Sequence, residues 1–187
     1  HQQRVNSIRF NSAGTQVVTA SDDNTAVVWN VADGRALFTL AQHTSWVNYA
    51  EFSPDGAHVI LGSDDGAISL WNAATGELIA MVQVFDYAVW HVAFSPDGKR
   101  LVVAGKDGAV LYDLDSGDEL ARLPHDFESR YAEFSPDSQR VATFDEGGIS
   151  VVWSALDGKE IVRMEGHRAP IYAAAWSPRG DTLATVS

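Results

Sequence analysis

Cysteine is absent from the 187-residue sequence, and basic residues are scarce, with 13 lysines and arginines against 25 acidic residues. The lack of cysteine excludes a disulfide framework and a thiolate zinc site, and it agrees with a reducing compartment, so we expect a cytoplasmic protein. The formal charge of −12 argues against nucleic acid or an anionic membrane as the main partner. It favours a protein or peptide partner whose surface is basic or weakly charged.

Motifs of catalysis and of metal binding are also missing. The sequence has no G-x-S-x-G elbow, no P-loop and no dinucleotide-binding glycine pattern. Its Asp-rich turns lack the glutamate that a calcium loop needs, and His58 and His91 have no matching ligand pattern around them. No run approaches the roughly 18 apolar residues of a membrane helix. We therefore predict no catalytic residue, no cofactor and no metal site.

A repeated phrase organises the chain. An aromatic residue followed by a turn recurs at intervals of 42, 42, 40 and 42 residues, at Phe10, Phe52, Phe94, Phe134 and Trp176. In the second copy, Ser53-Pro54-Asp55-Gly56 is typical of a tight reversal between two short strands. Residues 67–71 then alternate apolar and polar, as a strand does. One period therefore predicts a four-stranded antiparallel meander, which neighbouring copies must cover.

The copies resemble the repeats of the WD-repeat β-propeller family. The resemblance rests on the SPDG turns, on Gly166-His167, and on the pairs that close the third strand, Trp29-Asn30, Trp71-Asn72, Tyr112-Asp113 and Trp153-Ser154. It implies an all-β fold of four-stranded antiparallel blades within a single segment, 1–187. We place the blades at 1–40, 43–82, 85–123 and 125–164, with a half blade at 167–187. Because closed rings have about seven blades, we expect a fragment of a larger propeller whose flanking sequence supplies the rest.

The same resemblance implies a structural tetrad in each blade: a histidine before the first strand, a hydroxyl on the second, an aspartate in the next turn and a tryptophan on the third. A buried indole and imidazole need such partners, so we assign these residues to structure and not to catalysis. The tetrad residues that we identify are His1, Thr19, Asp23 and Trp29 in copy one; His43, Asp65 and Trp71 in copy two; His125, Thr143 and Trp153 in copy four; and His167 and Thr185 in copy five.

Some tetrad positions hold unsuitable residues. Copy two has Leu61 at the hydroxyl position, and copy four has Gly147 at the aspartate position, directly after Asp145 and Glu146. Copy three keeps Asp107 but has apolar or altered residues elsewhere, namely Phe85, Val103 and Tyr112. We expect the network to weaken from blade to blade, and we expect that Leu61→Thr would stabilise blade two.

Residues that vary while the frame repeats are our candidates for partner binding. They lie before and in the first strand of each copy and in the turn between the second and third strands, which the repeat places at one end of the blades. Trp, Tyr and Arg among them are types that anchor interfaces. An alternative is that the aromatic residues pack against neighbouring blades. The candidates are Arg4, Trp46, Asn48, Trp90, Arg130, Tyr172, Asp22, Asp64, Lys106 and Glu146.

Two classes of function fit this sequence. By resemblance, the first is a non-catalytic scaffold or sensor module for protein–protein interaction. The second is an accessory propeller domain of a larger enzyme, such as a peptidase or a signalling ATPase or kinase, whose catalytic residues would lie outside these 187 residues. Fold alone does not choose between them.

Overall fold

Short alternating segments separated by tight turns produce an all-β protein in the computed structural model, which describes residues 1–171 and 173–187. Blade one consists of β1 (Val5–Phe10), β2 (Gln16–Ser21), β3 (Ala26–Asn30) and β4 (Ala36–Leu40). Blade two consists of β5 (Val47–Phe52), β6 (His58–Ser63), β7 (Ala67–Asn72) and β8 (Leu78–Gln83). Within the described residues, no helix is long and apolar enough to span a bilayer.

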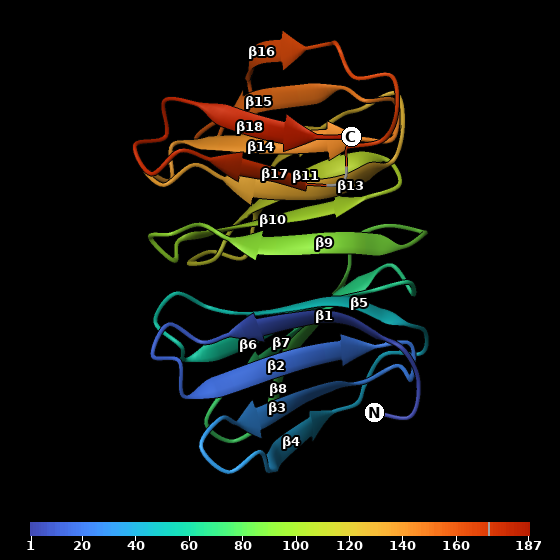
Figure 1. Ribbon diagram of the computed structural model, residues 1–187, viewed down its shortest axis with the longest axis vertical. Coiled ribbons are helices and arrows are strands. Elements are labelled where there is room, and N and C mark those ends of the chain that lie inside the picture. The colour runs from blue at the N-terminus through green and yellow to red at the C-terminus, as the bar shows by residue number, and fades with distance from the viewer. Residues whose placement is uncertain (172) are drawn as a thin grey trace. The chain divides into compact units, whose positions relative to one another are not determined.

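The later blades repeat this order. Blade three consists of β9 (Val89–Phe94), β10 (Arg100–Gly105), β11 (Gly108–Asp113) and β12 (Glu119–Leu123). Blade four consists of β13 (Ser129–Phe134), β14 (Arg140–Asp145), β15 (Ser150–Ser154) and β16 (Glu160–Met164). A hairpin follows, β17 (Ala173–Trp176) and β18 (Leu183–Val186). Each blade is an antiparallel sheet with its strands in sequence order (Figure 1).

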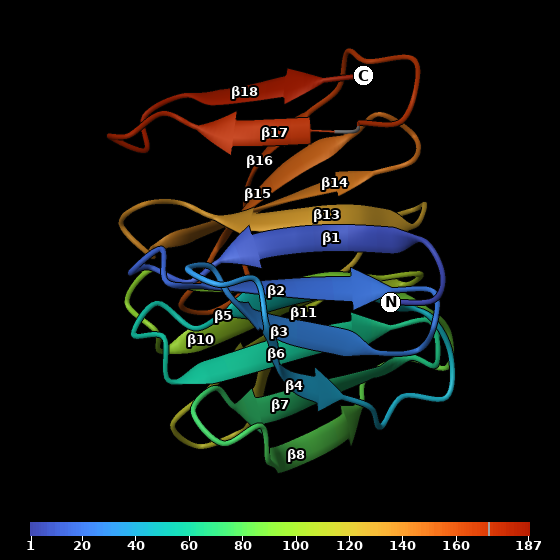
Figure 2. The ribbon, with the colours of Figure 1, turned by 60° about the horizontal axis from the view of Figure 1, so that its bottom comes forward.

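The chain divides into two compact units, His1–Val92 and Ala93–Ser187, with β9 crossing the boundary. In the first unit, the sheets of blades one and two pack face to face (Figures 1 and 2). Blade one contributes Val18, Ala20, Val28 and Leu40 to this core, and blade two contributes Val47, Phe52, Leu61 and Trp71. In the second unit, blade three packs on blade four in the same way, and Ile171 and the hairpin cover the other face of blade four.

One face of blade one is exposed although its counterpart in blade two is buried. Phe10 is 63% exposed, whereas Phe52, at the equivalent position, is 5% exposed because blade one covers it. Ile8 is likewise exposed where blade two has the buried Ala50. Identical strand patterns therefore present the same apolar face, and burial depends on whether another sheet lies against it.

The turn between the second and third strands has a left-handed residue at the same position in every blade. Asn24, Gly66, Gly108 and Gly148 have φ angles of 67°, 83°, 105° and 82°. A side chain at Gly66 would collide with the carbonyl oxygen of Phe85, so the loop that follows the fourth strand packs directly on this turn. Gly108 and Gly148 are approached in the same way, so the loop leading to the next repeat lies beside the turn of the preceding blade.

Candidate functional site

In blade one, four side chains form a continuous chain of hydrogen bonds. The indole N–H of Trp29 donates to Thr19 Oγ1 at 2.8 Å. The Thr19 hydroxyl lies 2.6 Å from His1 Nε2, and His1 Nδ1 lies 3.0 Å from Asp23 Oδ2. Because the indole can only donate, the threonine hydroxyl is free to donate to Nε2, which leaves a neutral imidazole whose Nδ1–H donates to the carboxylate. Every polar group of the chain is thereby satisfied.

Blade two has a complete chain as well, which corrects the expectation drawn from Leu61. The hydroxyl comes from Ser69 on β7: its Oγ accepts from the Trp71 indole at 2.8 Å and lies 2.7 Å from His43 Nε2. His43 Nδ1 lies 3.0 Å from Asp65 Oδ2. Leu61 and Ser69 are paired across the β6–β7 ladder, as Thr19 and Val27 are in blade one. The hydroxyl has therefore moved to the cross-strand neighbour on the same face.

Sequence reasoning missed Ser69 because it compared only equivalent positions. The sequence could have identified Ser69, because it stands two residues before Trp71 and alternate residues of a strand share a face. A hydroxyl at either of two paired positions can reach the same imidazole. The premise of the predicted gain from Leu61→Thr is wrong, because the network that it would complete is already complete.

Blade four takes its carboxylate from a position that the sequence analysis did not select. Asp145, the last residue of β14, is buried, and its Oδ2 lies 3.1 Å from His125 Nδ1. The rest of the chain follows blade one, with His125 Nε2 2.5 Å from Thr143 Oγ1 and the Trp153 indole donating to the same oxygen at 2.7 Å. Gly147 lies against the ring of Phe127, which would have to move to admit a side chain there.

Burial determines the charge of the histidine in the blade-four network. Desolvation lowers the pKa of His125, and it outweighs the neighbouring carboxylate of Asp145, which acts to raise that pKa. The imidazole is therefore neutral at neutral pH, as the hydrogen-bond directions require. A neutral, fully hydrogen-bonded histidine buried with its carboxylate is a structural element, because it presents neither a reactive atom nor a free proton acceptor to solvent.

Blade three and the hairpin have only parts of the tetrad. At the four tetrad positions blade three has Phe85, Val103, Asp107 and Tyr112. Val110 faces Val103 across the ladder, so neither of these two paired positions carries a hydroxyl. In the hairpin, His167 Nε2 lies 2.8 Å from Thr185 Oγ1. Among the residues that the structure describes, no group of three His, Cys, Asp or Glu side chains could hold a metal ion.

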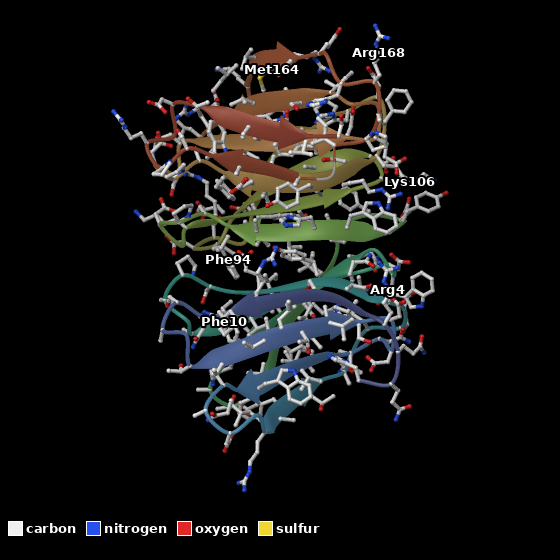
Figure 3. The ribbon with its side chains drawn as sticks, in the orientation of Figure 1. Arg4, Phe10, Phe94, Lys106, Met164 and Arg168 are labelled. Atoms are coloured by element: carbon white, nitrogen blue, oxygen red, sulfur yellow. The ribbon has the colours of Figure 1, made fainter. Side chains whose placement is uncertain are left out.

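The loop entering each blade and the turn between its second and third strands meet at one end, which we call the entrance end. Backbone hydrogen bonds join them: Asp22 N donates to Arg4 O at 2.9 Å, Asp64 N to Trp46 O at 2.9 Å, and Glu146 N to Glu128 O at 3.1 Å. In Figure 3, Arg4 lies at this end of the first unit and Phe10 at the other. In the second unit, Lys106 and Arg168 lie at the entrance end and Phe94 opposite.

Several residues that the sequence singled out for partner binding contact one another within a blade. Asn48 Nδ2 donates to Asp64 Oδ1 at 2.6 Å, and the equivalent Asn6 donates to Asp22 at 2.7 Å. In blade four the same two positions hold Arg130 and Glu146, an ion pair with a distance of 2.6 Å between Nη2 and Oε1. The variation between copies is therefore correlated within each blade. Partner binding by these residues stays a prediction.

The other candidates have different surroundings. Trp46 is 51% exposed, and Arg4 and Lys106 are also exposed, whereas Trp90 is only partly exposed. Tyr172 lies outside the described residues. Two exposed aromatic residues escaped the sequence analysis, Tyr87 and Phe127, each 55% exposed in the loop entering its blade. They stand one position before Ala88 and Glu128, which are equivalent to Arg4 and Trp46, so the comparison of equivalent positions passed over them.

Four-stranded blades held by buried His-hydroxyl-Trp chains define the class: this is an array of β-propeller blades. The WD40 family model, described as WD domain, G-beta repeat, matches residues 1–30, 34–72, 79–111 and 158–187, more than half of the chain. The chain belongs to the WD40 family, and the expectation of an all-β, incomplete propeller of WD-repeat blades is confirmed. WD40 repeats indicate a protein-interaction module, and domains of this family are generally non-catalytic scaffolds.

Proposed function

We propose that this chain is a non-catalytic scaffold or sensor module whose entrance ends bind a protein or peptide partner with a basic surface. The observation that carries the proposal is the exposure of three aromatic side chains at those ends, Trp46, Tyr87 and Phe127. Large aromatic side chains that remain half exposed are the type of residue that anchors interfaces. The membership of the WD40 family supports the same role.

The charge around these aromatic residues supports a basic partner. Asp86 and Asp126 directly precede Tyr87 and Phe127, and the backbone of Asp64 is hydrogen-bonded to that of Trp46. An aromatic face beside a carboxylate attracts lysine and arginine, through the ring quadrupole and through the opposite charge. The net charge of −12 acts in the same direction over longer distances.

The test is to capture binding partners on the immobilised chain and then measure the affinity of the recovered partner for variants. Trp46→Ala and Tyr87→Ala should each weaken binding by about 1 to 3 kcal/mol, if the side chain is an anchor. Their melting temperatures should not change, because both side chains are half exposed. The matched control is Leu156→Ala, which removes an apolar side chain that is 71% exposed in the β15–β16 turn, at the opposite end. An equal loss from Leu156→Ala would contradict the proposal.

A further inference from the structure

The outer strand of blade two, β8, is more apolar and more exposed than the outer strands of the other blades. All six of its residues are exposed, and none of them is charged. Four large apolar side chains of β8 are exposed, whereas β4 and β12 expose one each and β16 exposes two. The four side chains are those of Leu78, Ile79, Met81 and Val82. An exposed apolar strand at the edge of a sheet can pair with a strand of another chain.

Charged pairs occupy the corresponding positions of β12 and β16. Each of these strands has a glutamate and an arginine in contact, with Nη2 2.8 Å from Oε2 in β12 and 3.0 Å from it in β16. The pairs are Glu119–Arg122 and Glu160–Arg163. The registers of the three sheets make Leu78 and Met81 the equivalents of these residues in β8. Charged side chains on an edge strand oppose pairing because pairing would desolvate them, and β8 lacks this protection.

The edge of β8 is open to solvent within the first unit. The strand ends the sheet of blade two, whose order is β5-β6-β7-β8, and it lies at the lower edge of the first unit in Figure 2. Met81 pairs with Ser69 across the ladder, so it lies on the face of blade two against which blade one packs. It is nevertheless 43% exposed, so blade one does not extend over this edge.

We propose that β8 pairs antiparallel with β8 of a second copy of this chain, about a twofold axis at Ala80. This register sets Leu78 opposite Val82 and Ile79 opposite Met81, so every cross-strand pair is apolar. A strand that is complementary to itself in this way suits an identical partner, because a twofold interface uses the same surface on both copies.

The outer strands of the other blades do not fit the same symmetric pairing. In β12 it would set Leu120 opposite Arg122, and in β16 it would set Ile161 opposite Arg163, each with a charge to desolvate. The outer strand of blade one has no charge, but Leu37 is its one large apolar side chain that is exposed. The inference is therefore specific to blade two.

Sedimentation velocity of the 187-residue chain over a range of concentrations tests the proposal. We expect a monomer–dimer equilibrium with a Kd on the order of 100 µM, because two paired strands bury little area. The contact is apolar and each copy carries a net charge of −12, so added salt should strengthen the dimer by screening the repulsion. A chain that stays monomeric up to roughly ten times that Kd would overturn the proposal.

A double variant locates the interface. Leu78→Glu/Met81→Arg installs the ion pair of blades three and four, so it should raise the Kd of the dimer at least about tenfold without lowering the melting temperature. The matched control, Thr39→Arg, places an arginine at the equivalent exposed position of β4 and should leave the Kd unchanged. The exposed Phe10 face is the rival surface. A dimer that survives in the double variant but is lost in Phe10→Glu would overturn the proposal.

A cysteine cross-link tests the register directly, because the natural sequence has no cysteine. Ala80→Cys would face its own copy across the twofold axis, at the separation that a disulfide between paired strands requires. Under mild oxidation it should form a covalent dimer at least about tenfold faster than Thr39→Cys, since only the first pair is held together by the strands. Equal rates for the two variants would contradict the pairing.

This inference goes beyond the proposed function, since it concerns a second copy of the chain and a strand away from the entrance ends. Trp46→Ala should therefore dimerise as the wild type does. Loss of the dimer in Trp46→Ala would place the contact between copies at the entrance end and overturn the β8 pairing. The affinity of the recovered partner for the same variant tests the proposed function separately.

Discussion

Blades one and two solve one packing problem with different residues. Blade one joins its indole and imidazole through Thr19 on β2, whereas blade two joins them through Ser69 on β7. The paired residue across the ladder is apolar in both blades, Val27 in one and Leu61 in the other. The requirement is thus for one hydroxyl at a point in space, and either of two neighbouring strands can supply it.

The two networks differ in how much water can reach them. Trp71 and His43 are buried in blade two, and Trp71 belongs to the core between the blades. In blade one, Trp29 is only partly buried, on the face that blade two does not cover and beside the exposed Phe10, whereas the His1 side chain is largely buried. Water can replace a lost hydrogen bond at Trp29 in blade one more readily than at Trp71 in blade two. The same chemical deletion should therefore cost more in blade two.

The largest effect is expected for Ser69→Ala. It leaves the Trp71 N–H and the His43 Nε2 buried without their shared partner, so the free energy of unfolding should fall by about 3 kcal/mol. Urea unfolding followed by tryptophan fluorescence measures this. Leu61→Thr/Ser69→Val, which copies the arrangement of blade one, should recover more than half of the loss. A loss no greater than that of Ser116→Ala, an exposed site, would contradict the comparison.

The repeat period and the turn residues were enough to predict the blades, because strand pairing in a meander depends on local alternation and on left-handed turn positions. The tetrad of blade one could also be read directly, since His1, Thr19, Asp23 and Trp29 stand at regular offsets. Ser69 and Asp145 could not be read this way. Each reaches its histidine from a position that is close in space but differs in sequence offset, and cross-strand register decides that closeness. The Asn–Asp and Arg–Glu pairs were missed for another reason: they keep one offset of 16 residues, but the contact between first strand and turn that joins them is set by the register of the sheet.

The buried histidines should make the free energy of unfolding depend on pH in the mildly acidic range. Burial, and then the charge of Arg9, lower the pKa of His91 to about 3, and burial also lowers the pKa of His125. The unfolded chain therefore binds protons near pH 6.5 that the folded chain does not, so stability is full above that pH and falls below it. The expected loss is about 1 kcal/mol per pH unit for His91 between pH 6.5 and 5, and His125 adds a loss of the same sign.

Carboxylates change the free energy of unfolding at a lower pH than the histidines do, so the two effects can be distinguished. Burial alone would raise the pKa of Asp65, but hydrogen bonds from Thr44, Ala67 and His43 lower it below the ordinary value of 3.8. Stability from such groups is lost only as the pH falls through that lower range. Urea midpoints measured at intervals between pH 7 and 5 should therefore show a smaller slope in His91→Leu than in the wild type. An unchanged slope in that variant would mean that His91 is protonated in the folded state.

The smallest effect is expected for Thr19→Val, the counterpart of the deletion in blade two. The substitution removes the oxygen that accepts from Trp29 and lies 2.6 Å from His1 Nε2, but the partly exposed Trp29 indole can turn to water on the face that blade two does not cover. The free energy of unfolding should fall by about 1 kcal/mol, and Val27→Ser in the same chain should restore it by moving the hydroxyl to the β3 position that Ser69 occupies in blade two. The measurement is the urea midpoint of the three chains compared at one pH. A loss equal to that of Ser69→Ala would show that water reaches the network of blade one no better than that of blade two. If Val27→Ser does not restore stability, the second and third strands are not equivalent sources of the hydroxyl.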